Sequence, residues 1–453
     1  MGYYVINEKD NVKVNLDNGH KYALRNIKKG EEIIKYGFSI GVATEDIKEN
    51  SHVHSHNLKT LLSGLKNYTY SPNFESLEPR KPIMINAYIR ENGDIGIRND
   101  IWVINTVGCI NKTAEKIANL TGSFAFPHPY GCSQLGEDYA ITQKILCGLI
   151  KHPNAGGVLV LGLGCENNNI PELKKVLGVY DKKRVRFLNI QDCEDEIEEA
   201  VKIIDELKEI CEVDIRQQVP ISKLKLGLKC GGSDGLSGIT ANPLCGKVSD
   251  KLISMGGTAV LTEVPEMFGA EQILMNRCEN ETVFDKTVDL INNYKQYFIN
   301  HNEPVSENPS PGNKEGGITT LEEKSLGCVQ KGGTATIVDV LDYGDILSKQ
   351  GLNLLNGPGN DIVAVTNLTA AGCHMILFTT GRGTPLGAPI PTLKIATNTV
   401  LAKQKTHWID FDAQSCNEDE LFDLIVETAN GKQSKNELNS YREIAIFKDG
   451  VTL

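Results

Sequence analysis

Three of the nine histidines in this chain of 453 residues fall within seven positions, in the stretch SHVHSHN at residues 51–57. His52, His54 and His56 alternate, and alternate side chains of an extended segment point to the same face. Neutral imidazole is a common metal ligand in proteins. The spacing therefore raises two hypotheses: a metal site, or a polar edge strand or turn at the surface.

Five glycine-rich loops follow segments that have the pattern of strands, and each loop holds a side chain that could do chemistry. In open α/β sheets, ligands bind beyond the carboxyl ends of the strands, so these loops are candidate binding positions. None of them carries the dinucleotide fingerprint or the phosphate loop of nucleotide enzymes, so we do not expect NAD or ATP chemistry. The loops are HPYGCS (128–133), GLGCEN (162–167), CGGSDGLSG (230–238), EVPEMFGAE (263–271) and TTGRGTPLG (379–387).

Three of these loops offer groups that could bind or transform an anionic substrate. Arg382 lies between two glycines, where its planar guanidinium could hold a carboxylate through two hydrogen bonds; the simpler alternative is a surface turn. Ser233 and Asp234 precede a predicted helix, so they either bind hydroxyl groups or cap the helix. Glu266 is an acid–base candidate within the loop 263–271, although an acidic loop exposed to solvent is the commoner case.

Two cysteines lie in glycine loops beside other possible ligands. Cys132 and Cys165 have His128 and Glu166 nearby. Thiolates mixed with nitrogen and oxygen donors suit Fe(II) or Mn(II), whereas the alternative is that both thiols are buried packing groups. No two of the twelve cysteines form a C-x-x-C pair, and the N-terminus has no apolar export segment. We therefore expect reduced thiols in a cytoplasmic protein.

Composition narrows the possible partners. The net charge is −11 and no dense block of Lys and Arg occurs, so nucleic acid is not an expected partner. No apolar run approaches the roughly 18 residues that a membrane span needs. A small anionic ligand would have to be bound by local cations, helix N-termini or a metal.

The strand and helix patterns divide the chain into regions that must position these residues. Residues 1–70 contain short apolar stretches separated by turns, which predicts a small β domain, and the proline-rich stretch 71–82 predicts a linker. Strands and helices alternate in 83–222, including a strongly periodic helix at 193–212, and again in 223–453. The predicted fold class is α/β, with a small N-terminal β domain followed by two α/β regions whose sheets are mainly parallel.

The motifs, taken in order, resemble those of the altronate/galactarate dehydratase family, whose members begin with a SAF-type domain. The resemblance covers nearly the whole chain, and the C-terminal stretches THWIDFDAQ and YREIAIFKDGVTL are similar to the galactarate branch. The other motifs are GHKYALRNIKKGEEIIKYGFSIGVATEDI followed by HVHSHN, YIRENGDIGIRN, HPNAGGVLVLGLGCEN, CGGSDGLSGITANP, NPSPGNKEGGITTLEEKSLG and FTTGRGTPLG with PTLKIATNT.

The resemblance implies a hydro-lyase that dehydrates a sugar acid with the help of a divalent metal. We predict galactarate as the substrate, giving 5-dehydro-4-deoxyglucarate, and Fe(II) as the metal, with Mn(II), Mg(II) or Ca(II) as alternatives. Altronate, giving 2-dehydro-3-deoxygluconate, and sulfolactate are alternative substrates. A non-catalytic module that binds a sugar acid is the alternative outside the enzymes. A homo-oligomer is compatible with the sequence, which does not define the number of subunits.

A candidate site follows from the loops and the resemblance together. His52 is expected to face solvent beside the ligand pair, and Cys109 is assigned no role because it follows Gly108, where the family usually has Asn. The β domain would have to reach the loops past residue 370 and cap them. The predicted metal ligands are His54, His56, Cys132, Cys165 and Glu166, the acid–base candidates are Glu266 and His128, and the substrate-binding residues are Arg98, Asn99, Ser233, Asp234, Thr379, Thr380, Arg382 and Lys394.

Overall fold

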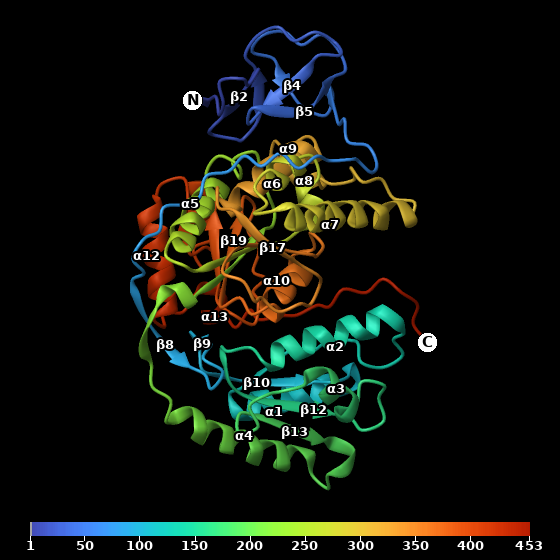
Figure 1. Cartoon of the computed structure of the whole chain (residues 1–453), viewed down its shortest axis with the longest axis vertical. Helices are drawn as coiled ribbons and strands as arrows, with labels where there is room; N and C mark the ends of the chain where they lie inside the picture. Colours follow the sequence, from blue (N-terminus) through green and yellow to red (C-terminus); the bar gives the residue numbers. More distant parts are fainter. Residues whose placement is uncertain (1) are drawn as a thin grey trace.

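The computed structural model describes residues 2–453, which form three domains arranged end to end (Figure 1). The N-terminal β domain lies at one end, the C-terminal α/β domain in the middle and the second domain at the other end. The order in space thus differs from the order along the chain. The segment that leaves the β domain therefore runs along the C-terminal domain before it enters the second domain.

The β domain consists of two small antiparallel sheets, with strand orders β1-β2-β3-β6 and β4-β5-β7. Its apolar residues alternate with polar ones, and Ile27, Ile33, Ile40 and Val53 are completely buried. The strands are β1 (Tyr3–Tyr4), β2 (Val12–Asn15), β3 (Lys21–Ala23), β4 (Glu32–Lys35), β5 (Phe38–Ala43), β6 (His52–Val53) and β7 (Leu58–Lys59).

The second domain is built on the parallel sheet β11-β10-β12-β13, which has helices on both faces. Val103 packs with Ile117 and Ile204 on one face, and Val160 packs with Leu149 on the other. The elements are β10 (Asp100–Asn105), α1 (Asn111–Thr121), β11 (Phe124–Ala125), α2 (Gly136–Ile150), β12 (Ala155–Gly162), α3 (Ile170–Leu177), β13 (Val185–Asn189) and α4 (Glu196–Glu212), beside a small antiparallel sheet of β8 (Met84–Ile89), β9 (Ile95–Gly96) and β14 (Gln217–Pro220).

The C-terminal domain has a seven-stranded parallel sheet of order β17-β18-β16-β15-β19-β20-β21. The chain moves from β15 to one side of the sheet and later crosses from β18 to β19 on the other side, so the topological switch point lies between β15 and β19. The strands are β15 (Lys225–Cys230), β16 (Thr258–Leu261), β17 (Ile337–Leu341), β18 (Gly351–Leu355), β19 (Met375–Thr380), β20 (Thr392–Ala396) and β21 (Phe411–Asp412).

Helices cover this sheet and extend toward both other domains (Figure 1). α9 lies beneath the β domain, and α10 lies on the side of the second domain. The helices are α5 (Ala241–Ser254), α6 (Glu271–Met275), α7 (Glu281–Asn300), α8 (Pro311–Glu315), α9 (Leu321–Cys328), α10 (Asp361–Ala370), α11 (Thr399–Gln404), α12 (Glu418–Ala429) and α13 (Lys435–Leu438).

The predicted fold class is confirmed: a small β domain precedes two α/β regions with parallel sheets. The predicted linker is part of an extended segment between β7 and β8 that is anchored to the C-terminal domain. Asn73 N donates to Asn276 O (2.8 Å), and Arg80 N donates to Ser254 O (2.7 Å). Within residues 2–453, none of the helices combines the length and the apolar character that crossing a membrane requires.

Candidate active site between the β domain and the C-terminal sheet

The loops after β15 and β19 flank the switch point of the C-terminal sheet, which is the position where open α/β sheets bind ligands. Asp234, in the loop after β15, bonds to the residues that follow β20: its Oδ2 accepts from Thr397 Oγ1 (2.8 Å) and Asn398 Nδ2 (3.3 Å). Asn398 Nδ2 also donates to Gly381 O (3.2 Å) in the loop after β19. A Cβ at Gly381 would lie 2.3 Å from Asp234 Cγ, so glycine is required at this close approach. Asp234 thus holds these loops together in the structure, and its predicted role in binding substrate hydroxyl groups stays a prediction.

Three other predicted substrate-binding residues of these loops bond to the protein itself. Ser233 Oγ lies 2.7 Å from Cys230 Sγ. Thr379 Oγ1 donates to Asn242 Oδ1 (2.6 Å), and Thr380 Oγ1 accepts from Gly383 N (2.8 Å). All three are buried, so they support the shape of the loops.

The β domain docks on these loops through a glycine contact that excludes any side chain. A Cβ at Gly235 would lie 1.9 Å from the carbonyl oxygen of Gly19, and a Cβ at Gly317 would lie 2.6 Å from the same atom. Backbone thus packs directly on backbone, and the turn before β3 enters the loop 315–317. This contact brings the histidines of the β domain to the C-terminal domain.

Four histidines gather at this contact, one more than the sequence analysis proposed. His20 Nδ1 lies 2.9 Å from His52 Nε2, and the His52 ring lies 5.3 Å from His54 and 5.7 Å from His56, centre to centre. His52 belongs to the cluster and is not merely a solvent-facing neighbour. His20 was missed because it is distant in sequence; its only signal was the turn NGH before a strand.

The histidines and Arg382 meet on the same short segment. His54 Nε2 lies 2.8 Å from Lys314 O, and His20 Nε2 lies 3.2 Å from Glu315 O. Arg382 Nη2 is paired with a carboxylate oxygen of Glu315 at 2.9 Å. Groups from the two ends of the chain therefore converge on residues 314–315, as the cap hypothesis requires.

The surroundings of His52 and His54 favour their neutral forms. Burial, together with the neighbouring His20 and His54, lowers the pKa of His52 to about 4, and burial also lowers the pKa of His54. Neutral imidazole suits a divalent metal. However, no three His, Cys, Asp or Glu side chains of residues 2–453 converge on a common point where they could hold one metal ion. The histidines alone therefore do not complete a metal site.

A cavity of about 970 Å³ opens next to the same segment, over the carboxyl ends of β15 and β16. Glu266 and Lys324 form an ion pair of 2.8 Å on its wall. Cys230 and Asp361 also line the cavity, whereas its far side is aromatic. The aromatic residues are Tyr294, Tyr297, Phe298 and Phe447.

Three buried lysines control the carboxylates behind this wall. Burial alone would raise the pKa of Glu266, but Lys324, Lys229 and Lys331 outweigh it and hold that pKa at about 2. Glu263 pairs with Lys229 and, at 3.2 Å, with Lys331, yet burial and its neighbour Glu266 raise its pKa to about 7. The backbone of Glu263 is left-handed (φ 73°), a strained conformation that is common at functional sites.

Two thiols join this network. Contact with Cys328 is the main cause that lowers the pKa of Cys230 to about 5, and Cys328 Sγ lies 3.1 Å from Glu266 Oε2. The lysines and Cys328 were missed from the sequence, because charges and thiols inside a strand or helix carry no signal of a binding site. The pairing of Lys229 with Asp361 (2.9 Å) joins residues far apart in the chain.

The predicted ligands of the second domain lie away from the histidine cluster, so the five proposed metal ligands fall into two groups. Glu166 is buried and accepts from Thr106 Oγ1 (2.5 Å) and Gly164 N (2.6 Å). His128 is buried with Nε2 at 2.8 Å from Asn105 O, and burial lowers its pKa. Both side chains hold loops together in the structure, and the ligand role of Glu166 and the acid–base role of His128 stay predictions.

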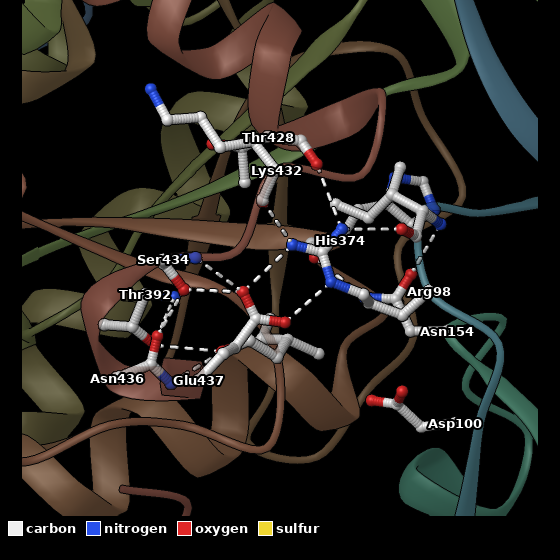
Figure 2. A network of polar contacts seen from close by, with 12 residues as sticks. Arg98, Asp100, Asn154, His374, Thr392, Thr428, Lys432, Ser434, Asn436 and Glu437 are labelled. Carbon is white, nitrogen blue, oxygen red and sulfur yellow. Dashed lines mark hydrogen bonds and ion pairs between the residues drawn. The ribbon is translucent and has the colours of Figure 1, made fainter. Parts of the chain in front are cut away.

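All the donors of Arg98, which was predicted to bind substrate, are engaged within the protein (Figure 2). All five N–H groups of its guanidinium bond to Glu437 and to the carbonyls of Ile97, Thr428 and Lys432. These contacts join the second domain to the C-terminal one.

The neighbouring Asn99 is also occupied, since it donates to Cys211 O (3.0 Å) and accepts from Arg90 (2.9 Å). Lys394 is fully buried, its Nζ has no hydrogen-bond partner, and burial lowers its pKa to about 8. Neither lies on the wall of the 970 Å³ cavity. The structure thus places both away from the candidate site.

Comparison with known proteins identifies the architecture along the whole chain. Residues 2–61 match the altronate/galactarate dehydratase SAF domain, residues 87–212 match the D-galactarate dehydratase/altronate hydrolase second domain, and residues 221–452 match the D-galactarate/altronate dehydratase C-terminal domain. These three matches follow the three domains described above.

Individual relatives agree with these matches. The chain is 52% identical to an altronate dehydratase of Escherichia coli, covering 99% of this chain and 95% of the relative, and 52% identical to one of Bacillus subtilis, covering 98% and 93%. It is 31% identical to a galactarate dehydratase of Escherichia coli, covering 95% and 89%. The chain therefore belongs to the altronate/galactarate dehydratase family, whose members are hydro-lyases of sugar acids.

Proposed function

We propose that this protein dehydrates altronate to 2-dehydro-3-deoxygluconate. The observation that carries the proposal is the full-length similarity to two altronate dehydratases, which is much higher than the similarity to a galactarate dehydratase. The expectation of galactarate, which rested on two C-terminal motifs, is therefore replaced by its alternative.

The cavity supports a substrate with one charged end. Lys314 and Lys324 lie on one part of its wall, and the opposite part is aromatic. An aldonate has a single carboxylate and ends in a primary alcohol, whereas an aldarate has a carboxylate at both ends. The aromatic residues carry no charge, and His301 beside them already lies 2.9 Å from a carboxylate oxygen of Asp449, so the cavity favours an aldonate such as altronate.

The reaction removes the proton on C2 and the hydroxyl group on C3, and the resulting enol tautomerises to the keto acid. Glu266 and Lys324 offer a proton acceptor and a proton donor side by side on the cavity wall. The negative charge of a bound substrate would oppose the cationic field on Glu266 and raise its pKa. We assign Glu266 to the C2 proton and Lys324 to the departing hydroxyl group.

Arg382 and the β domain would complete the site. Arg382 can exchange its exposed partner Glu315 for a substrate carboxylate. The docked β domain would exclude water from the enol intermediate. A divalent metal stays a prediction, because the histidines do not complete a site for one, and the steps above use only side chains of this chain.

A substrate panel tests the proposal directly. The purified protein is incubated with Fe(II) or Mn(II) and, separately, with altronate, galactarate, glucarate and sulfolactate, and the 2-keto-3-deoxy acid or sulfite is measured. We expect kcat/KM for altronate to exceed that for the other acids by at least about tenfold. Preferential turnover of galactarate or sulfolactate would refute the assignment, and binding without product would indicate a sugar-acid binding module.

A further inference from the structure

All three exposed cysteines of this chain lie at one edge of one sheet. The twelve cysteines are all free; six are buried and three are half-buried. The exposed ones are Cys109, Cys132 and Cys165. They lie in the loops that follow β10, β11 and β12, which are neighbouring strands of the parallel sheet in the second domain.

The strand register places these thiols at the same level. β10 and β12 pair in parallel with Asn105 opposite Leu161, and each of these two residues is followed four positions later by a cysteine. β11 pairs with the other side of β10. Each cysteine also precedes a helix, α1, α2 or α3, so all three thiols lie on the ligand-binding edge of the sheet.

Hydrogen bonds hold the three loops together right beside the cysteines. Gly108 N donates to Tyr130 O (2.8 Å), which joins the first loop to the second. Asn168 N donates to Gly131 O (2.9 Å), which joins the second loop to the third. Cys132 Sγ itself lies 3.5 Å from Asn167 Oδ1. The three thiols are therefore held around one rim.

Glycines let the loops approach so closely. A Cβ at Gly131 would lie 1.9 Å from Thr106 O, and one at Gly108 would lie 2.7 Å from His128 O. On the third loop, Gln191 Nε2 donates to Cys165 Sγ at 3.5 Å. An amide N–H that faces a sulfur stabilises its thiolate form.

We propose that Cys109, Cys132 and Cys165 bind a [4Fe–4S] cluster through three thiolates. Thiolates select soft metal centres, and all twelve cysteines of this chain are free. The three thiols do not converge on a point for a single ion. A cluster does not need them to, because each thiolate binds a different iron atom around a shared core.

Binding exchanges ligands without a change of oxidation state. Each cysteine displaces one external thiolate from a preformed cluster. An Fe–S bond to the cysteine replaces the Fe–S bond to the external thiolate. The proton of the cysteine thiol is transferred to the thiolate that leaves. The fourth iron keeps no protein thiolate. That iron can bind a hydroxyl or carboxylate oxygen of a hydroxy acid as a Lewis acid, a role that rests on the proposed function.

The position of the rim fits such a role. A second cavity, of about 490 Å³, begins at Leu135 and Asp138, just after the Cys132 loop. It shares Tyr294, Tyr297 and Phe447 with the cavity that holds Glu266 and Lys324. The two cavities thus connect the edge of the second domain to the candidate active site.

The test uses the full-length protein under anaerobic conditions with a preformed [4Fe–4S] complex of a small thiol. After the excess is removed, iron, acid-labile sulfide and zinc are measured, with visible absorption and electron paramagnetic resonance as spectroscopic readouts. We expect about four iron and four sulfide per chain. C109S, C132S and C165S should each lower both by at least about tenfold, whereas C416S, which changes a half-buried thiol of the C-terminal domain, should lower neither.

Three results would overturn the proposal: no iron and sulfide in the wild-type protein, full retention in any of the three rim variants, or zinc without sulfide. Thermal unfolding of the cluster-free variants checks that they fold, and their exposed thiols make serine a mild change. Dehydration of altronate is measured separately. A loaded protein without turnover would refute the proposed function alone, and turnover without a cluster would refute the cluster alone.

Discussion

Lys21 of the β domain and Glu323 of α9 form an ion pair of 2.8 Å that is completely buried between their two domains. Lys35 approaches the other carboxylate oxygen of Glu323, also at 2.8 Å. Burial alone would raise the pKa of Glu323, but the two lysines lower it to about 2. One carboxylate of the C-terminal domain thus fixes the domain that carries the histidines.

Neutralising this carboxylate should release the β domain. In Glu323→Gln, Lys21 and Lys35 would stay buried without a counter-charge, at a cost of about 3 kcal/mol or more. We expect faster cleavage by a protease in the segment between β7 and β8, together with a lower unfolding temperature. Glu31→Gln, which removes only the exposed pair with Arg25, should change either property little. Equal protection of Glu323→Gln and wild type would contradict the prediction.

The same pair should make docking sensitive to acid. The pKa of Glu323 falls from 4.5 to about 2 on folding, so its contribution is fully present above pH 4.5 and is lost as pH falls toward 2. His52, whose pKa falls from 6.5 to about 4, adds a loss that begins below pH 6.5. Urea unfolding of wild type and Glu323→Gln should therefore differ most above pH 4.5. If the difference in unfolding free energy between the two proteins increased below pH 4.5, the prediction would be wrong.

Much of the architecture could be predicted, because it depends on local patterns. The periodic pattern at residues 193–212 predicted a helix, and the structure has α4 (Glu196–Glu212) there. The alternation of strands and helices predicted parallel sheets, which the structure also has. Arg382 and Glu266 could be proposed as candidates because they lie in loops after strands. Those loops are where α/β sheets bind ligands, so a local pattern was sufficient.

The missed residues depend on contacts between distant segments. Lys229 lies in KLKLGLKC, where a lysine in an alternating strand suggests solvent exposure, yet it is fully buried. Its partner Glu263 is 34 residues away, and no periodicity connects them. Conversely, the sequence suggested that Arg98 binds the substrate. In the structure its guanidinium pairs with Glu437, which is 339 residues away in the sequence. In both cases the environment of the side chain depends on a partner that is distant in the sequence.

Arg382 should matter through its shape as well as its charge. Arg382→Lys keeps the positive charge but loses the planar pair of donors, so we expect kcat/KM for altronate to fall by about 2 kcal/mol or more, about 30-fold. Arg186→Lys, a change on an exposed arginine of the second domain, serves as the control. The measurement is the steady-state kcat/KM of both variants. An unchanged kcat/KM in Arg382→Lys would show that Arg382 does not bind the substrate carboxylate.

The Glu266–Lys324 pair should control the chemical step. Glu266→Gln keeps the shape but cannot accept a proton, so kcat should fall at least about 100-fold while KM changes less. Lys286→Met, on an exposed lysine of α7, is the matched control for Lys324→Met. Circular dichroism and thermal unfolding show whether each variant folds. A folded Glu266→Gln protein with normal kcat would exclude Glu266 as the base.

The β domain should be required for turnover but not for folding of the rest. The C-terminal sheet shares a buried core with the second domain, which also contacts it through Arg98 and the C-terminal segment. Removing residues 1–61 should therefore leave a folded protein that binds altronate weakly, because Arg382 and the cavity remain. Dehydration should be lost, because the histidines are absent and water reaches the enol. Circular dichroism, calorimetric binding and product formation are measured on the same preparation. Full turnover by the truncated protein would show that the histidine cluster and the cap play no part in the reaction.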